Sequence, residues 1–189
     1  DKQNIKELRK VEINGTYLID AYESLGSGPK ALKILRSIDP VTGAKTWYYV
    51  EVRKATGFDA YLANQSSQNI LNGVLIHMGT EGNGNTSYLL DMTPATPVYE
   101  WWYDPALLVG QTFNDASAGV SITTVGVSDT GAAVTVGFGL AVALSTDKSA
   151  YNRNQTVNIT AVVTSGGAPL GNGGRTFTIK KAKKSGGTA

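Results

Sequence analysis

The chain contains no cysteine and a single histidine, His77, among its 189 residues. The lack of cysteine excludes disulfide bridges, thiolate zinc ligands and thiol nucleophiles. One histidine leaves almost no room for a histidine-based catalytic centre, and no G-x-S-x-G nucleophile turn accompanies it. His77 lies in the apolar run "GVLIHMG", where a hydrogen-bonded structural role is the favoured interpretation. We therefore expect the chain to be non-catalytic.

Basic residues are missing from the middle of the chain. Residues 55–144 hold 7 Asp or Glu and no Lys or Arg, although the net charge of the whole sequence is +2. A solvated acidic surface is the favoured interpretation of this block. The basic stretch "IKKAKKSGG" near the end has no interleaved aromatic residue, so we expect a strand edge or linker there and no nucleic-acid partner.

Long apolar runs are also absent. No stretch approaches the roughly 20 residues needed to cross a bilayer, so we expect no membrane span. The first residues lack the basic-then-apolar order of a signal peptide. We expect the sequence to begin inside a longer polypeptide.

The sequence is rich in Thr, Val, Gly and Ser, a composition that favours strands and turns. Apolar residues alternate along many short segments, which predicts Leu32 and Ile34 on one core face and Tyr48, Val50 and Val52 on another. Only "DKQNIKELRK" looks helical. We predict an all-β antiparallel sandwich, jelly-roll-like, over residues 14–139, preceded by a leader segment at 1–13. Its loop "GFDAYLANQSSQ" is expected to touch the core through Phe58 and Leu62.

The composition shifts near Gly139, and the remainder contains three strand patterns, at 142–145, 156–164 and 175–181. An immunoglobulin-like sandwich needs about seven strands. Residues 140–189 therefore predict a partial immunoglobulin-like domain. Truncation is the favoured explanation, and completion by a neighbouring chain, with self-association, is the alternative.

The motif series "YYVEVR", "GVLIH", "LLDMTP" and "VGQTF" resembles the β-sandwich region that follows the catalytic domain in secreted bacterial peptidases, chiefly gametolysin-like metallopeptidases and some subtilisin-like enzymes. The resemblance covers roughly residues 15–138, and the tail resembles the first half of bacterial immunoglobulin-like repeats. The H-E-x-x-H signature of the metallopeptidases is missing. The resemblance therefore implies an extracellular accessory region whose partner is a parent catalytic domain.

The stretch "VYEWWYDP" concentrates aromatic side chains. Packing is the favoured interpretation, and the alternative is a carbohydrate-binding platform. The candidate ligand-binding residues are Tyr99, Glu100, Trp101, Trp102 and Tyr103.

Four aspartates fall at predicted turns or strand ends, where carbonyl oxygens are free to complete a calcium site. They are Asp59, Asp91, Asp104 and Asp115. Turn capping is the favoured interpretation, and calcium is the one cofactor that the pattern suggests as an alternative.

These observations predict a non-catalytic accessory module of a secreted or cell-surface bacterial hydrolase, with a peptidase as the favoured parent, that serves in substrate or surface attachment. A polysaccharide or protein polymer is the expected ligand. The alternatives are a carbohydrate-binding module and a structural stalk or filament unit.

Overall fold

The computed structural model describes residues 7–64, 69–96, 103–150, 152, 157–166 and 168–169. These residues form mostly strands, so the predicted all-β, sandwich-like class is confirmed. The strands are β1 (Leu8–Val11), β2 (Gly15–Asp20), β3 (Ala31–Ile38), β4 (Lys45–Glu51), β5 (Gly73–Thr80), β6 (Asn83–Leu89), β7 (Leu107–Leu108), β8 (Thr112–Asp115), β9 (Val120–Val127), β10 (Gly131–Phe138), β11 (Leu140–Thr146), β12 (Ile159–Ser165) and β13 (Ala168–Pro169). Two 3₁₀ helices, η2 (Gly57–Asn64) and η3 (Ile70–Asn72), lie between β4 and β5. No helix in the described ranges is long and apolar enough to cross a membrane.

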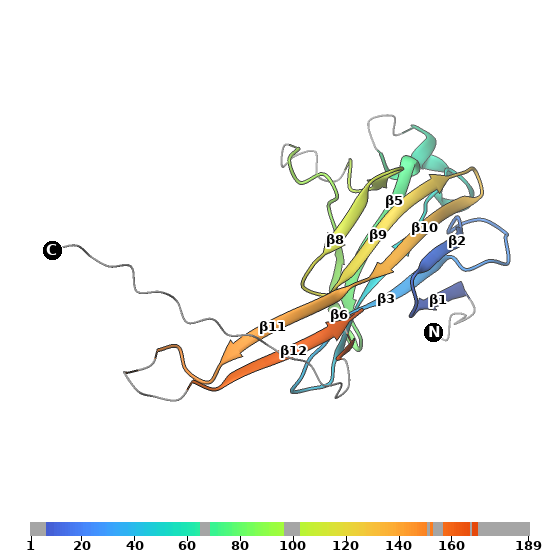
Figure 1. The fold of residues 1–189 in the computed structure, drawn as a ribbon. Coiled ribbons are helices and arrows are strands. Elements are labelled where there is room, and N and C mark those ends of the chain that lie inside the picture. The colour runs from blue at the N-terminus through green and yellow to red at the C-terminus, as the bar shows by residue number, and fades with distance from the viewer. Residues whose placement is uncertain are drawn as a thin grey trace.

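Two sheets face each other to form the sandwich (Figure 1). One has the order β1-β3-β4-β5-β6, with β7 paired to β5, and the other has the order β2-β10-β9-β8. All pairs are antiparallel except β1 with β3, which run parallel. The chain crosses between the sheets more than once, so residues distant in sequence meet in one core.

The core lies between the two sheets and is built by alternating residues of both, because successive side chains of a strand point to opposite faces. Leu32 and Ile34 of β3 are fully buried, as are Tyr48, Val50 and Val52 in and just after β4, as predicted. Facing them are Ile19 of β2, Val120 and Ile122 of β9, and Val134 and Val136 of β10.

One correction concerns the segment at 1–13, expected to be a leader outside the sandwich. Its residues Leu8–Val11 are strand β1, paired with β3 from Leu8↔Ala31 onward. Val11 enters the core, and the Arg9 guanidinium lies 4.7 Å from the centre of the Tyr17 ring. The charged side chains of this strand hid its alternation in the sequence.

Beyond Phe138 the chain leaves the sandwich. Strands β11 and β12 form a long hairpin that projects away from the two sheets (Figure 1), and β13 adds two residues at its base. The strand pattern predicted at 175–181 lies outside the described residues. The domain boundary near Gly139 stays a prediction, and in the structure β10 ends at Phe138 and β11 begins at Leu140.

Candidate functional site

The aromatic stretch singled out in the sequence falls largely on Tyr99, Glu100, Trp101 and Trp102, which lie outside the described residues. For these four residues, packing and ligand contact both stay predictions. Tyr103 is 42% exposed, and its carbonyl accepts a 2.7 Å hydrogen bond from the Asn69 amide. The end of the stretch is thereby anchored next to η3.

Asp91 and Asp104 belong to one network of turns. Thr93 donates its amide to Asp91 Oδ1 at 2.8 Å and its hydroxyl to the Asp104 carbonyl at 2.8 Å. The Thr96 hydroxyl reaches Asp104 Oδ1 at 3.4 Å. In this geometry the two aspartates hold local turns together.

Asp59 and Asp115 lie apart from that network, each beside an arginine. The distance from Arg53 Nη1 to Asp59 Oδ2 is 3.1 Å, and that from Arg36 Nε to Asp115 Oδ2 is 3.3 Å. Within the described part of the chain, no group of three or more Asp, Glu or His is arranged to hold a metal ion. Calcium binding by these four aspartates therefore stays a prediction, because the described residues do not bring them together into one site.

A polar cluster forms around Arg53, just after β4. Arg53 Nε donates to Glu51 Oε1 at 2.9 Å, and its guanidinium also pairs with Asp59. His77 Nε2 lies 3.3 Å from the same Glu51 oxygen, and the Arg53 guanidinium stacks 4.1 Å from the centre of the Tyr22 ring. We call Tyr22, Glu51, Arg53, Asp59 and His77 the Arg53 cluster.

Charge compensation favours the ionised forms of Glu51 and Arg53 within this cluster. Burial alone would raise the pKa of Glu51, but hydrogen bonds from His77 and Arg53 outweigh it, so this pKa is lowered. Burial works against the Arg53 charge, but its bonds to Glu51 and Asp59 raise the pKa of the guanidinium. The structural role predicted for His77 agrees with this arrangement, since the imidazole lies against a carboxylate already paired with arginine.

The loop between β2 and β3 is organised by a buried lysine. Lys30 is 6% exposed, and its Nζ donates to the Ser24 carbonyl and Ser24 Oγ, each at 2.7 Å, and to the Ala21 carbonyl at 3.2 Å. Asp20 accepts the Gly28 amide at 2.8 Å and lies 3.8 Å from Lys30 Nζ. A β-carbon at Gly28 would lie 2.8 Å from Asp20 Oδ1, so a side chain there would require the Asp20 carboxylate to shift.

Helix η2 has an inner and an outer face. Residues three apart lie on the same side of a 3₁₀ helix. Asp59 and Leu62 are buried, so Phe58 and Tyr61 point outward, where they are 91% and 60% exposed. The expectation that Leu62 touches the core is confirmed, and the same expectation for Phe58 is wrong. Asp59 takes the inward position because its carboxylate pairs with Arg53.

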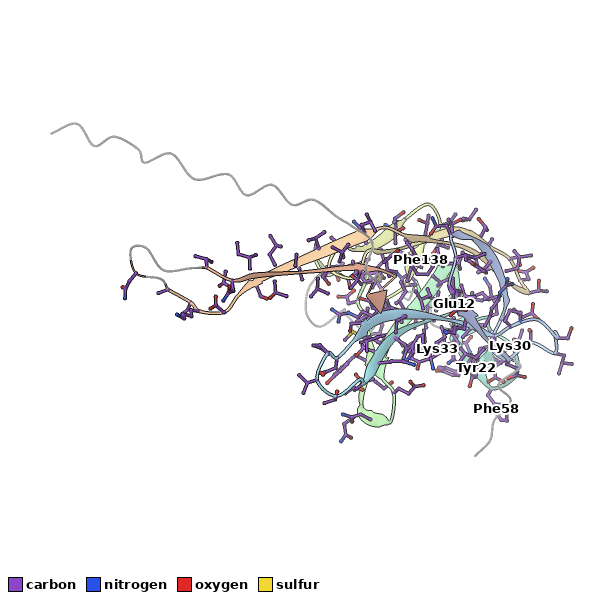
Figure 2. The ribbon with its side chains drawn as sticks, turned by 60° about the horizontal axis from the view of Figure 1, so that its bottom comes forward. Glu12, Tyr22, Lys30, Lys33, Phe58 and Phe138 are labelled. Atoms are coloured by element: carbon purple, nitrogen blue, oxygen red, sulfur yellow. The ribbon has the colours of Figure 1, made fainter. Side chains whose placement is uncertain are left out.

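These two loops lie side by side at one end of the sandwich. The Glu23 side chain lies against Gly57, so closely that a β-carbon there would be 3.0 Å from Glu23 Oε2. Figure 2 shows Tyr22, Lys30 and Phe58 at the same end, away from the β11–β12 hairpin. We call the exposed Tyr22, Leu25, Phe58 and Tyr61 the loop-end surface. Leu25 is 105% exposed, which means that it contacts almost nothing of its own chain.

A separate buried group lies on the outer side of the larger sheet. Trp47 is 4% exposed there because Lys33 covers it, with Nζ 4.2 Å from the ring centre. Its Nε1 has no hydrogen-bond partner among the described residues. The pKa of Glu81 is lowered, first by Lys33 and to a smaller extent by the Trp47 indole. The cation–π contact explains why this ring is buried without entering the core.

Sequence reasoning missed Tyr22, Leu25 and Tyr61, and also the charged residues Lys30 and Arg53 that support them. One signal was available for Leu25, a large apolar residue inside the turn-forming stretch "SLGSGPK". A large apolar residue in such a turn either packs into the core or is exposed to solvent, and Leu25 is exposed. The loop conformation that exposes it includes the pair of Asp20 with Lys30, and this pair cannot be identified from residue spacing.

No protein-family description, curated protein or solved structure matches the chain.

Proposed function

We propose that this chain is a non-catalytic accessory module of a larger extracellular bacterial hydrolase of the peptidase class, and that it attaches the enzyme to its substrate or to a surface. The parent class and the extracellular location rest on the resemblance to the region that follows the catalytic domain in secreted peptidases. The parent catalytic domain is then its covalent partner.

The observation that carries the attachment role is the loop-end surface. Four large side chains are exposed together, and loop tips held by a rigid scaffold are where binding residues concentrate. Beneath them, Glu51, Asp59 and His77 are engaged with Arg53 or with one another. The ionisable groups here support the fold, and the exposed rings and Leu25 are free to contact a partner.

The test is sedimentation of the whole chain with insoluble polymers such as cellulose, chitin, peptidoglycan and collagen. We expect saturable depletion of the protein from solution by one of them. A folded chain that stays in solution with every polymer contradicts substrate attachment. The carbohydrate-binding alternative is tested by titrating tryptophan fluorescence with soluble polysaccharides and with calcium. A saturable shift that Trp101→Ala/Trp102→Ala loses would assign binding to residues 99–103.

A second candidate function, a stalk or filament unit, is favoured by the β11–β12 hairpin. The register Leu140↔Ser165 through Thr146↔Ile159 places Leu140, Val142 and Leu144 on one face, together with Ile159 of β12. These side chains are 43–66% exposed. An apolar face, with strand edges that pair with no other described strand along most of their length, is suited to strand addition from a neighbour. Sedimentation velocity tests it, since association is expected and a strictly monomeric chain contradicts it.

A further inference from the structure

We propose that the loop-end surface inserts into the interface of a zwitterionic lipid bilayer, with Leu25 and Phe58 as the inserting side chains. This inference deepens the proposed attachment function by naming one surface to which the module attaches. It can fail while attachment to a polymer, which is measured separately, still holds.

The shape of the surface favours a lipid occupant. Leu25 and Phe58 are 105% and 91% exposed, so they project from the loops and do not line a hollow. Figure 2 shows Phe58 extending away from the ribbon. A protein partner for such projections needs a matching pocket, whereas the acyl region of a bilayer adapts to any apolar side chain. Tyr22 and Tyr61 add amphipathic rings of the kind enriched at the membrane–water interface.

The scaffold beneath is already ordered. Nζ of Lys30 bonds to Ala21 and Ser24, and the Tyr22 amide donates to the Val52 carbonyl at 3.0 Å. The second loop is fixed by the pair of Arg53 with Asp59. Binding then requires little additional ordering of the backbone, and this lowers its entropic cost.

The charges at this end select the type of lipid. Lys30 lies close to Asp20, Arg53 is paired with Glu51 and Asp59, and Lys54 Nζ donates to the Leu71 carbonyl at 2.8 Å. Glu23, beside Gly57, adds negative charge. Anionic headgroups attract clusters of free Lys and Arg. A surface whose basic groups are already engaged, next to an acidic side chain, fits neutral headgroups better.

The experiment is flotation of the whole chain with vesicles of phosphatidylcholine alone and of phosphatidylcholine mixed with phosphatidylserine. The test variant is Leu25→Ser/Phe58→Ser. The control is Ile13→Ser/Val41→Ser, because Ile13 and Val41 are 73% and 91% exposed in other turns. Val41 lies in the turn after β3, at the opposite end of that strand from the loop 21–30.

We expect the native chain and the control to float with phosphatidylcholine vesicles, with no gain from phosphatidylserine. The test variant should bind at least about a hundredfold more weakly, the factor expected when two large apolar side chains no longer leave water. All three proteins should melt alike, since none of the four positions is buried. A native chain that does not float, or a test variant that floats as well as the native chain, overturns the proposal. Loss of polymer sedimentation by the test variant, without flotation of the native chain, would assign the loop-end surface to a polymer instead.

Discussion

The Tyr48 hydroxyl, on the larger sheet, donates a 2.7 Å hydrogen bond to the Asp115 carboxylate, on the smaller one. Arg36 Nε approaches both groups, at 3.0 Å from the hydroxyl and 3.3 Å from the carboxylate. The Tyr48 ring also meets Phe113 edge to face, with centroids 5.3 Å apart. This contact joins the two layers of the sandwich beside β8, at a residue that the sequence suggested as a calcium ligand.

Removal of the Tyr48 hydroxyl tests how much this contact stabilises the fold. Tyr48→Phe keeps the ring but removes the hydroxyl that donates to Asp115, and leaves the Arg36 ion pair as the contact of this carboxylate across the layers. We expect a loss of about 1.5–3 kcal/mol in the free energy of unfolding, the usual range for a hydrogen bond to a charged group. Urea denaturation measures it. Tyr61→Phe is the control, because its ring is exposed. Equal stability of the two variants would show that the contact contributes little.

The same pair predicts a dependence on alkaline pH. Burial, with the hydrogen bond to Asp115, raises the pKa of Tyr48 from 10.0 to about 12. A group whose pKa is higher in the folded state stabilises fully below its unfolded pKa and loses that effect as pH rises. The difference in unfolding free energy between the native chain and Tyr48→Phe should therefore be constant up to pH 10.0 and shrink toward about 12. A difference that stays constant across this window would contradict the raised pKa.

The Arg53 cluster predicts a large loss when its cation is removed. In Arg53→Met, Glu51 and Asp59, each 9% exposed, lose the positive charge between them. We expect a loss of about 3 kcal/mol or more at neutral pH, because uncompensated buried charge is costly. The loss should shrink as pH falls below the ordinary Glu pKa of 4.5 and through the lowered pKa of Glu51 in the folded native chain, because the stabilisation by this ion pair disappears over that window. Arg53→Lys should recover only part, since an ammonium lacks the planar fork that reaches both carboxylates. A loss that does not change with pH would contradict the electrostatic explanation.

Two glycines at the base of the hairpin differ in whether an added side chain would clash with the sandwich. Gly166 has φ +57°, and a β-carbon there would lie 2.6 Å from the Phe138 ring, whereas nothing lies within 4 Å of one at Gly139. Gly166→Ala should therefore loosen the hairpin from the sandwich, and Gly139→Ala should not. Hydrogen exchange of the β11 and β12 amides measures the effect, with faster exchange expected only in Gly166→Ala. Equal protection in both variants would show that the Phe138 contact does not hold the hairpin.

Alternation along single strands predicted much of the core, because burial on one face leaves a period of two in the sequence. Leu32, Ile34, Tyr48, Val50 and Val52 are all where that period places them. Strand β1 was missed because Arg9 and Lys10 interrupt its apolar positions, although Arg9 packs on an aromatic ring. Phe58 was misplaced because η2 has a period near three, and a charged residue, Asp59, takes its inward position.

The candidate site was less predictable than the fold. The loop-end surface depends on two contacts, one between Lys30 and Ser24 within the loop 21–30 and one between Arg53, just after β4, and Asp59 in η2. Neither contact leaves a periodic signal, and Lys30, Arg53 and Asp59 look like ordinary surface charge in the sequence. The exposed side chains that they support could therefore be identified only from the folded arrangement.

The central claim, attachment without catalysis, is tested most directly by one sedimentation experiment in which both the protein and the soluble products are measured. The whole chain is incubated with the insoluble polymers named above, and the supernatant is assayed for remaining protein and for released fragments. The account predicts saturable loss of protein from the supernatant with one polymer and no released fragments with any of them. A folded chain that binds none of the polymers would contradict attachment to a substrate, and one that releases soluble fragments would contradict the absence of catalysis.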